Sequence, residues 1–144
     1  MYTIVVGVDG SDGSLAALRH ALEEARLRGG ARIRAVMAWT YPPFALAPAP
    51  LGAGVAPVEA MDEAAMAALE DAIAAVGDPD DLHIERIVEM GRAAPVLVEL
   101  SKDADLVVVG SRGHGGLSGA LLGSVSQRVA GAAHCPVLVV PWHG

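Results

Sequence analysis

The sequence predicts a doubly wound α/β domain built on a five-stranded parallel sheet, with helices on both faces. Two short runs, residues 3–8 and 105–109, are almost entirely apolar and rich in β-branched side chains, as strands buried on both faces of a parallel sheet are. Segments with helical spacing separate the strand-like runs, and regular alternation of this kind is typical of parallel sheets. The length of 144 residues fits one domain, and we expect a single domain over residues 1–144.

The first half of the chain is predicted to form two strands and two helices. After the strand at 3–8, apolar residues recur at helical spacing over residues 15–28, and a pair of glycines ends that helix. A second strand is expected over residues 32–39. Residues 41–57 are rich in proline, alanine and glycine without periodicity, which predicts a long loop, either a lid over a site or an unstructured insertion. An alanine-rich helix follows over residues 58–76.

The second half repeats the alternation. Residues 83–90 mix polar and apolar side chains, which suits an outer strand, and residues 93–102 form a short helix. The buried strand at 105–109 leads into a glycine-rich segment, after which we expect a helix over residues 124–133 and a last strand over residues 136–140.

Composition excludes several classes of protein. A net charge of −7 argues against broad binding of nucleic acids, whose phosphates an acidic surface repels. The single cysteine excludes an internal disulfide and a four-cysteine zinc site, and the five histidines lack metal-ligand spacing. We recognise no signal peptide and no apolar run suited to a membrane helix, so we expect a cytoplasmic protein without membrane partners.

The glycine-rich segment is the strongest candidate for a binding site. Glycine leaves backbone N–H groups accessible, and a helix start near Gly123 and Ser124 would attract phosphate through its free N–H donors and dipole. Ser126 would add a hydroxyl donor and Arg112 a positive charge. The alternative is a glycine-rich turn in which Ser124 is a simple N-cap. Ligands of such sheets bind beyond the carboxyl ends of the strands where the strand order reverses, so the loop that begins at Asp9 would share one crevice with this segment if the first and fourth strands are neighbours.

The spacing of the glycines resembles a known pattern. The segment contains neither GxxxxGK[ST] nor GxGxxG. Gly110, Gly113 and the pair Gly123-Ser124 instead match G-2x-G-9x-G-[S/T], the pattern of the ATP-binding branch of the universal stress protein family. The blocks IVVGVDGSDGS, DLVVVGSRGHGG and AAHCPVLVVP extend the resemblance over nearly the whole chain. The resemblance implies the sheet order 3-2-1-4-5, in which the first and fourth strands are neighbours.

The resemblance also implies a ligand and its contacts. ATP would bind with Asp9 facing the ribose or the metal; from the residues alone, Asp9 is equally well an N-cap of the first helix. We expect Mg²⁺ or Mn²⁺ to bridge the phosphates, because the site supplies one arginine and no lysine to offset their charge. The backbone of Met37 would contact adenine, or that of Val36 or Ala38 if the alignment shifts by one residue. The other implied contacts lie on the adenine side, in the ribose and phosphate loop, and at the phosphate-binding helix start: Gly7, Val8, Gly110, Ser111, Arg112, Gly113, Gly123, Ser124, Val125 and Ser126.

The resemblance implies a nucleotide-binding regulatory protein of the stress response, and two alternatives remain open. The same fold could bind cyclic AMP or AMP, or it could be a nucleotide-free interaction module. The resemblance implies a homodimer formed through the last strand, Val137–Val140, whose apolar edge would invite pairing with a second copy. No catalytic residues are predicted: no strong general base is evident, so any hydrolysis of ATP is expected to be slow.

Overall fold

The computed structural model describes residues 1–41, 54–112 and 122–142, and within them the chain forms one five-stranded parallel sheet. The strand order is β3-β2-β1-β4-β5, which confirms both the predicted fold class and the predicted order. In chain order the strands are β1 (Thr3–Gly7), β2 (Arg32–Trp39), β3 (His83–Met90), β4 (Leu106–Gly110) and β5 (Val137–Val140).

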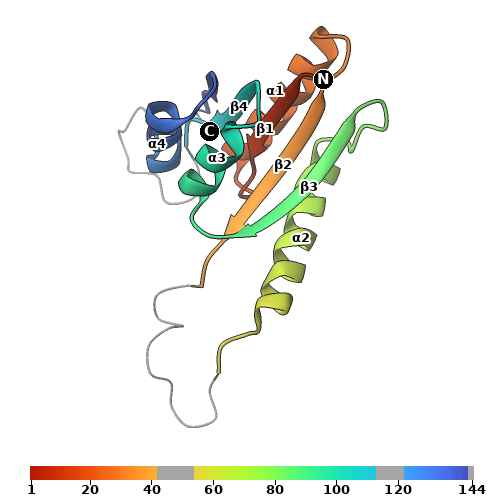
Figure 1. Ribbon diagram of the computed structural model, residues 1–144. Coiled ribbons are helices and arrows are strands. Elements are labelled where there is room, and N and C mark those ends of the chain that lie inside the picture. The colour runs from red at the N-terminus through yellow and green to blue at the C-terminus, as the bar shows by residue number, and fades with distance from the viewer. Residues whose placement is uncertain (42–53, 113–121, 143–144) are drawn as a thin grey trace.

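Helices cover both faces of this sheet (Figure 1). The described helices are α1 (Asp12–Leu27), α2 (Val58–Ala75), α3 (Ala93–Ser101) and α4 (Ser124–Ala132). The apolar side chains of α1 and α2 share one buried cluster with the sheet, and those of α3 and α4 share a second cluster with the opposite face. None of the helices in the described residues is long and apolar enough to cross a membrane.

The two central strands fit the expectation of burial on both sides. Ile4 and Val6 of β1 pack under α1, whereas Val5 points to the α3 side, and all three are fully buried. β4 begins one residue later than predicted because Asp105 lies before the strand, where its Oδ2 accepts the backbone N–H of Thr3 at 2.8 Å. This bond fixes β4 beside β1, and the two carboxyl ends therefore lie next to each other.

α1 begins three residues earlier than the spacing of its apolar residues predicts. Ser11 is its N-cap, and the Ser11 side chain accepts the backbone N–H of Ser14 at 3.2 Å. Asp12 in the first turn adds a negative charge at the positive end of the helix dipole. Capping therefore extends the helix into residues that the apolar pattern does not reach.

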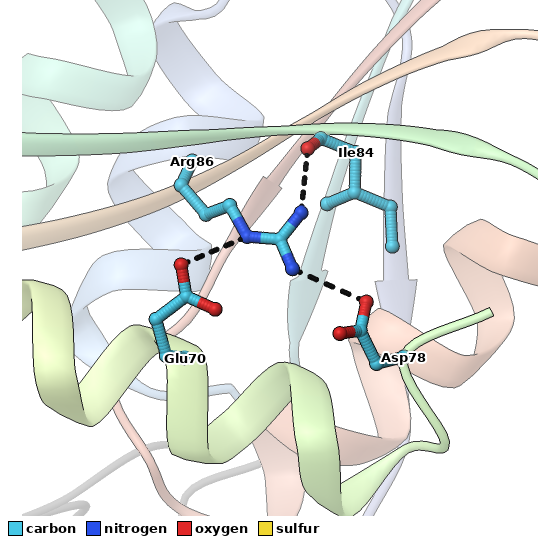
Figure 2. A network of polar contacts seen from close by, with 4 residues as sticks. All are labelled: Glu70, Asp78, Ile84 and Arg86. Carbon is cyan, nitrogen blue, oxygen red and sulfur yellow. Dashed lines mark hydrogen bonds and ion pairs between the residues drawn. The ribbon is translucent and has the colours of Figure 1, made fainter. Parts of the chain in front are cut away.

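A polar network fastens the end of α2 to the outer strand β3 (Figure 2). The Arg86 guanidinium donates to Glu70 of α2 and to Asp78, each at 3.1 Å, and to the carbonyl of Ile84 at 2.9 Å. Single exposed ion pairs contribute little to stability, but one guanidinium that bridges a helix, a turn and a strand restricts how α2 can lie on β3.

The predicted loop at 41–57 is described only at its two ends, because residues 42–53 lie outside the described part of the chain. The Tyr41 hydroxyl donates to the carbonyl of Ala56 at 2.6 Å, and its ring meets that of Trp39 edge to face. Trp39 Nε1 in turn donates to Asp62 of α2 at 2.7 Å. The two ends of the segment are thus held together at the start of α2.

Candidate functional site

A cleft opens at the carboxyl ends of β1 and β4, where the order of the strands reverses. Its open space is about 710 Å³, counting the part that merges with solvent. Its wall combines the ends of three strands with the starts of α1, α3 and α4. This is the place at which doubly wound sheets bind their ligands, because the loops that follow the strands diverge there.

The structure brings nine of the twelve predicted contact residues to this cleft. They come from β1 and the residues after it, from β4 and the residues after it, and from the start of α4: Gly7, Val8, Asp9, Gly110, Arg112, Gly123, Ser124, Val125 and Ser126. The remaining three differ. Gly113 lies outside the described residues, and Met37 and Ser111 do not line the cleft.

Met37 is on the other face of β2. Side chains alternate along a strand, and Met37 packs in the cluster shared with α1 and α2. Its neighbours Val36 and Ala38 line the cleft instead. They are the two positions to which a shift of the alignment by one residue leads.

Four lining residues were missed by sequence reasoning: Ser14, Ala93, Leu97 and Val109. Leu97 and Val109 form an apolar inner wall, and an apolar residue that lines a cleft has the same sequence pattern as one in the core. Ser14 lies in the first turn of α1, where its hydroxyl donates to the Ser11 carbonyl at 3.0 Å and accepts the Asp9 N–H at 3.2 Å. Ser11 and Ser14, which follow Asp9 closely, are the feature of the sequence that could have predicted this network of capping hydrogen bonds.

Asp9 lies at the cleft but is not the N-cap of α1, so that alternative for Asp9 was wrong. Ser11 takes the capping position. The Asp9 carboxylate accepts the backbone N–H of Ser11 at 2.9 Å and also the Ser11 hydroxyl. These bonds orient an exposed carboxylate at the mouth of the cleft.

The start of α4 presents backbone donors to the cleft. Gly123 is the N-cap without a side-chain cap bond, so the alternative that Ser124 caps this helix was wrong. The first intrahelical bond runs from Gln127 N–H to the Gly123 carbonyl at 3.0 Å. Within the described residues no acceptor is found for the backbone N–H groups of Ser124, Val125 and Ser126. They stand at the positive end of the helix dipole, where anions are stabilised.

The Ser126 hydroxyl has a structural partner. It is almost fully buried and lies 3.1 Å from the Ser111 carbonyl and 3.0 Å from the Gly123 carbonyl, so its single proton is directed to the backbone. Donation to an anion at this helix start therefore falls to backbone N–H groups and to the exposed Ser124 hydroxyl.

Two glycines let the start of α1 approach the loop after β4. A Cβ added at Gly110 would lie 2.7 Å from the Gly13 carbonyl oxygen, and one added at Gly13 would lie 2.4 Å from that of Arg112. Real Cβ atoms do not come this close to backbone atoms. The close approach sets the backbone position of Arg112, the cationic residue that lines the cleft.

The cleft offers few groups for acid-base or metal chemistry. Among its described lining residues, Asp9 is the one carboxylate and Arg112 the one cation. No group of three or more histidine, cysteine, aspartate or glutamate residues within ranges 1–41, 54–112 and 122–142 could hold a metal ion. Away from the cleft, burial and the charge of Asp105 raise the pKa of the Cys135 thiol, which makes it a poor nucleophile at neutral pH.

Comparison with known proteins relates nearly the whole chain to one family. The model of the universal stress protein family matches residues 1–141. A universal stress protein of Mycolicibacterium smegmatis is 38% identical over 143 residues, which cover 95% of this chain and 45% of that protein. The chain thus spans about half the length of several curated relatives that it matches.

Solved structures agree with this likeness. UspA from Lactobacillus plantarum superposes with a TM-score of 0.73 at 21% identity, covering 96% of this chain and 97% of that one, which establishes the fold alone. A crystal structure of a universal stress protein in complex with cAMP has a TM-score of 0.63 at 32% identity, covering 96% of this chain and 95% of that one.

Proposed function

The chain belongs to the universal stress protein family, and from this premise we propose that it is a nucleotide-binding regulatory protein that binds ATP in the cleft between the ends of β1 and β4. The observation that carries the proposal is the start of α4. Ser124, Val125 and Ser126 line the cleft, their backbone N–H groups have no acceptor among the described residues, and Arg112 lines the same cleft. Donors of this kind bind phosphate without lysine, which suits a chain with a net charge of −7.

The opposite part of the cleft suits an aromatic base. Part of the cleft wall is apolar and is formed by Val36, Ala38, Leu97 and Val109. A base that stacks against this wall removes its apolar surface from water, which favours binding. Gly7 keeps this wall open, because a Cβ there would lie 2.9 Å from a Leu97 methyl carbon. With the base on this wall and the phosphates at α4, the ribose falls near Asp9.

A divalent cation fits this cleft only as part of a nucleotide complex. Asp9 supplies one carboxylate, and the described residues contain no cluster that could bind a metal alone. Mg²⁺ is commonly bound by one or two carboxylates together with substrate phosphates, so phosphate oxygens would provide most of the ligands. When bound, the ion would neutralise phosphate charge that Arg112 alone does not balance.

Cyclic AMP is the second candidate ligand. The solved universal stress protein in complex with cAMP is 32% identical to this chain. Backbone N–H donors at the start of α4 serve one phosphate as well as three. AMP would use the same donors.

Titration calorimetry with ATP, AMP and cyclic AMP, each with and without Mg²⁺, tests the proposal. We expect ATP to bind more tightly than AMP, because its further phosphates reach Arg112 and the cation, and we expect Mg²⁺ to strengthen ATP binding most. Equal affinities for the three would contradict the ATP assignment. Failure of all three to bind would contradict nucleotide binding and favour a nucleotide-free interaction module.

We also propose that two copies pair through the outer edge of β5. The carbonyls of Pro136 and Val140 accept N–H groups from β4 and its end, so the backbone groups of Val137 and Val139 point away from the sheet. A parallel edge strand with free backbone groups and apolar side chains favours pairing.

Val139→Pro tests this edge. Proline removes an outward N–H and leaves the bonds to β4, so we expect the protein to change from dimer to monomer while the sheet stays folded. Analytical ultracentrifugation measures the mass and circular dichroism the fold. A folded variant that remains dimeric would show that the copies pair elsewhere.

A further inference from the structure

The backbone N–H, the carbonyl and the hydroxyl of Ser111 all form hydrogen bonds, although Ser111 does not line the cleft. It is buried, with 6% of its surface exposed. Its N–H donates to the Val140 carbonyl at 2.8 Å, and its Oγ accepts the Trp142 N–H at 3.1 Å. Its carbonyl accepts the Gly123 N–H at 2.6 Å and the Ser126 hydroxyl at 3.1 Å.

These bonds join two parts of the molecule. Gly123 and Ser126 line the cleft at the start of α4. Val140 ends β5, the edge strand of the sheet, and Trp142 follows it with 39% of its surface exposed. Within the described residues, Ser111 thus connects the start of α4 to the end of β5 through hydrogen bonds.

The start of α1 packs against the same region. A Cβ added at Gly13 would lie 3.6 Å from Trp142 Cβ and 2.4 Å from the Arg112 carbonyl oxygen. The segment after β5 therefore packs where the start of α1 meets the loop after β4. This packing keeps Trp142 close to Ser111, and the hydrogen bond from the Trp142 N–H to Ser111 Oγ is the contact that a change at the cleft would strengthen or weaken.

We propose that Ser111 is a positioning residue that couples occupancy of the cleft to the docking of residues 140–142 at the end of β5. The inference rests on the proposed nucleotide binding and adds a regulation of that site. A phosphate at α4 restrains Gly123 and Ser126, which strengthens their bonds to the Ser111 carbonyl and holds its Oγ against Trp142. Coupling is reciprocal, so docking of residues 140–142 also favours binding of the nucleotide.

Exchange of the Trp142 amide hydrogen, followed by NMR, measures this coupling directly because that amide is the donor to Ser111 Oγ. We expect saturating ATP to slow its exchange at least about fivefold in the unaltered protein, a typical lower size for coupled sites. In Ser111→Ala the amide loses its acceptor, so ATP should leave its exchange unchanged. Ser111→Thr keeps the hydroxyl and should restore the effect.

Ser101→Ala is the matched control. Ser101 is also a buried serine, and its Oγ accepts the backbone N–H of His134 at 2.9 Å. His134 lies shortly before the first residue of β5. It has no place in the cleft lining. We expect Ser101→Ala to speed amide exchange at His134. ATP should still slow amide exchange at Trp142 in this variant. If loss of any buried serine abolished the ATP effect, the effect would not be specific to Ser111.

Calorimetry on the same samples separates the coupling from the proposed function. ATP that binds the unaltered protein without slowing Trp142 exchange, or that still slows it in Ser111→Ala, overturns the coupling and leaves nucleotide binding intact. If neither ATP, AMP nor cyclic AMP binds the unaltered protein, the proposed function and the coupling both fall. We also expect Ser111→Ala to bind ATP about fivefold more weakly, although Ser111 does not line the cleft.

Discussion

Replacing Gly123 with leucine is expected to weaken ATP binding by at least about 100-fold while the protein stays folded. Gly123 is buried, lines the cleft and has φ −75° and ψ 171°, which a leucine adopts without backbone strain. Its side chain would therefore occupy space at the phosphate end of the cleft or displace the wall there. Titration calorimetry measures the affinity, and circular dichroism the fold.

Gly131→Leu is the control for this variant. Gly131 lies in the same helix, is exposed, and has no atom within 4 Å of an added Cβ. We expect it to bind ATP with unaltered affinity. The cost to stability of Gly123→Leu should be about 1–3 kcal/mol, since leucine is a poor N-cap and Gly123 is buried. If folded Gly123→Leu binds ATP with the same affinity as Gly131→Leu, the start of α4 is not part of the ATP site.

Gly13→Ala is expected to destabilise the fold, although alanine normally stabilises a helix. The added Cβ would lie 2.4 Å from the Arg112 carbonyl oxygen, so the backbone of α1 or of the loop after β4 has to move. We expect the free energy of unfolding to fall by about 1–3 kcal/mol. ATP affinity should fall as well, because Arg112 is displaced. Urea denaturation and calorimetry measure the two effects.

The sign of the change is the test of this contact. Gly131→Ala makes the same substitution at an open helix position and should raise the free energy of unfolding by up to about 1 kcal/mol. Stabilisation by both alanines would show that the start of α1 does not press against Arg112.

The architecture could be predicted because the patterns that carry it are local. β1 and β4 are apolar on both faces and so indicate central parallel strands, and the alternation with helices follows from the spacing of apolar residues. Ends of elements were less accurate where polar side chains decide them. Ser11 caps α1 earlier than its apolar residues indicate, and Asp105 bonds Thr3 before β4 begins.

Contacts of the cleft were harder to predict than its location. Successive side chains of β2 point to opposite faces of the sheet, so Val36 and Ala38 line the cleft and Met37 does not. A shift of one residue in the alignment exchanges the two faces. Leu97 reaches the cleft through tertiary packing that no local pattern records. The hydrogen bonds of Ser111 join residues far apart in the chain, so a glycine-rich segment does not predict them.

One measurement tests the central proposal most directly: the change in backbone amide chemical shifts when ATP is added with Mg²⁺. If the phosphates bind at the start of α4, the largest changes will be at Ser124, Val125 and Ser126, with smaller ones at Gly7 and Val8 near the base. The amides of β3, on the far edge of the sheet, should change little. Bound ATP that leaves the amides of Ser124, Val125 and Ser126 unshifted would contradict the account.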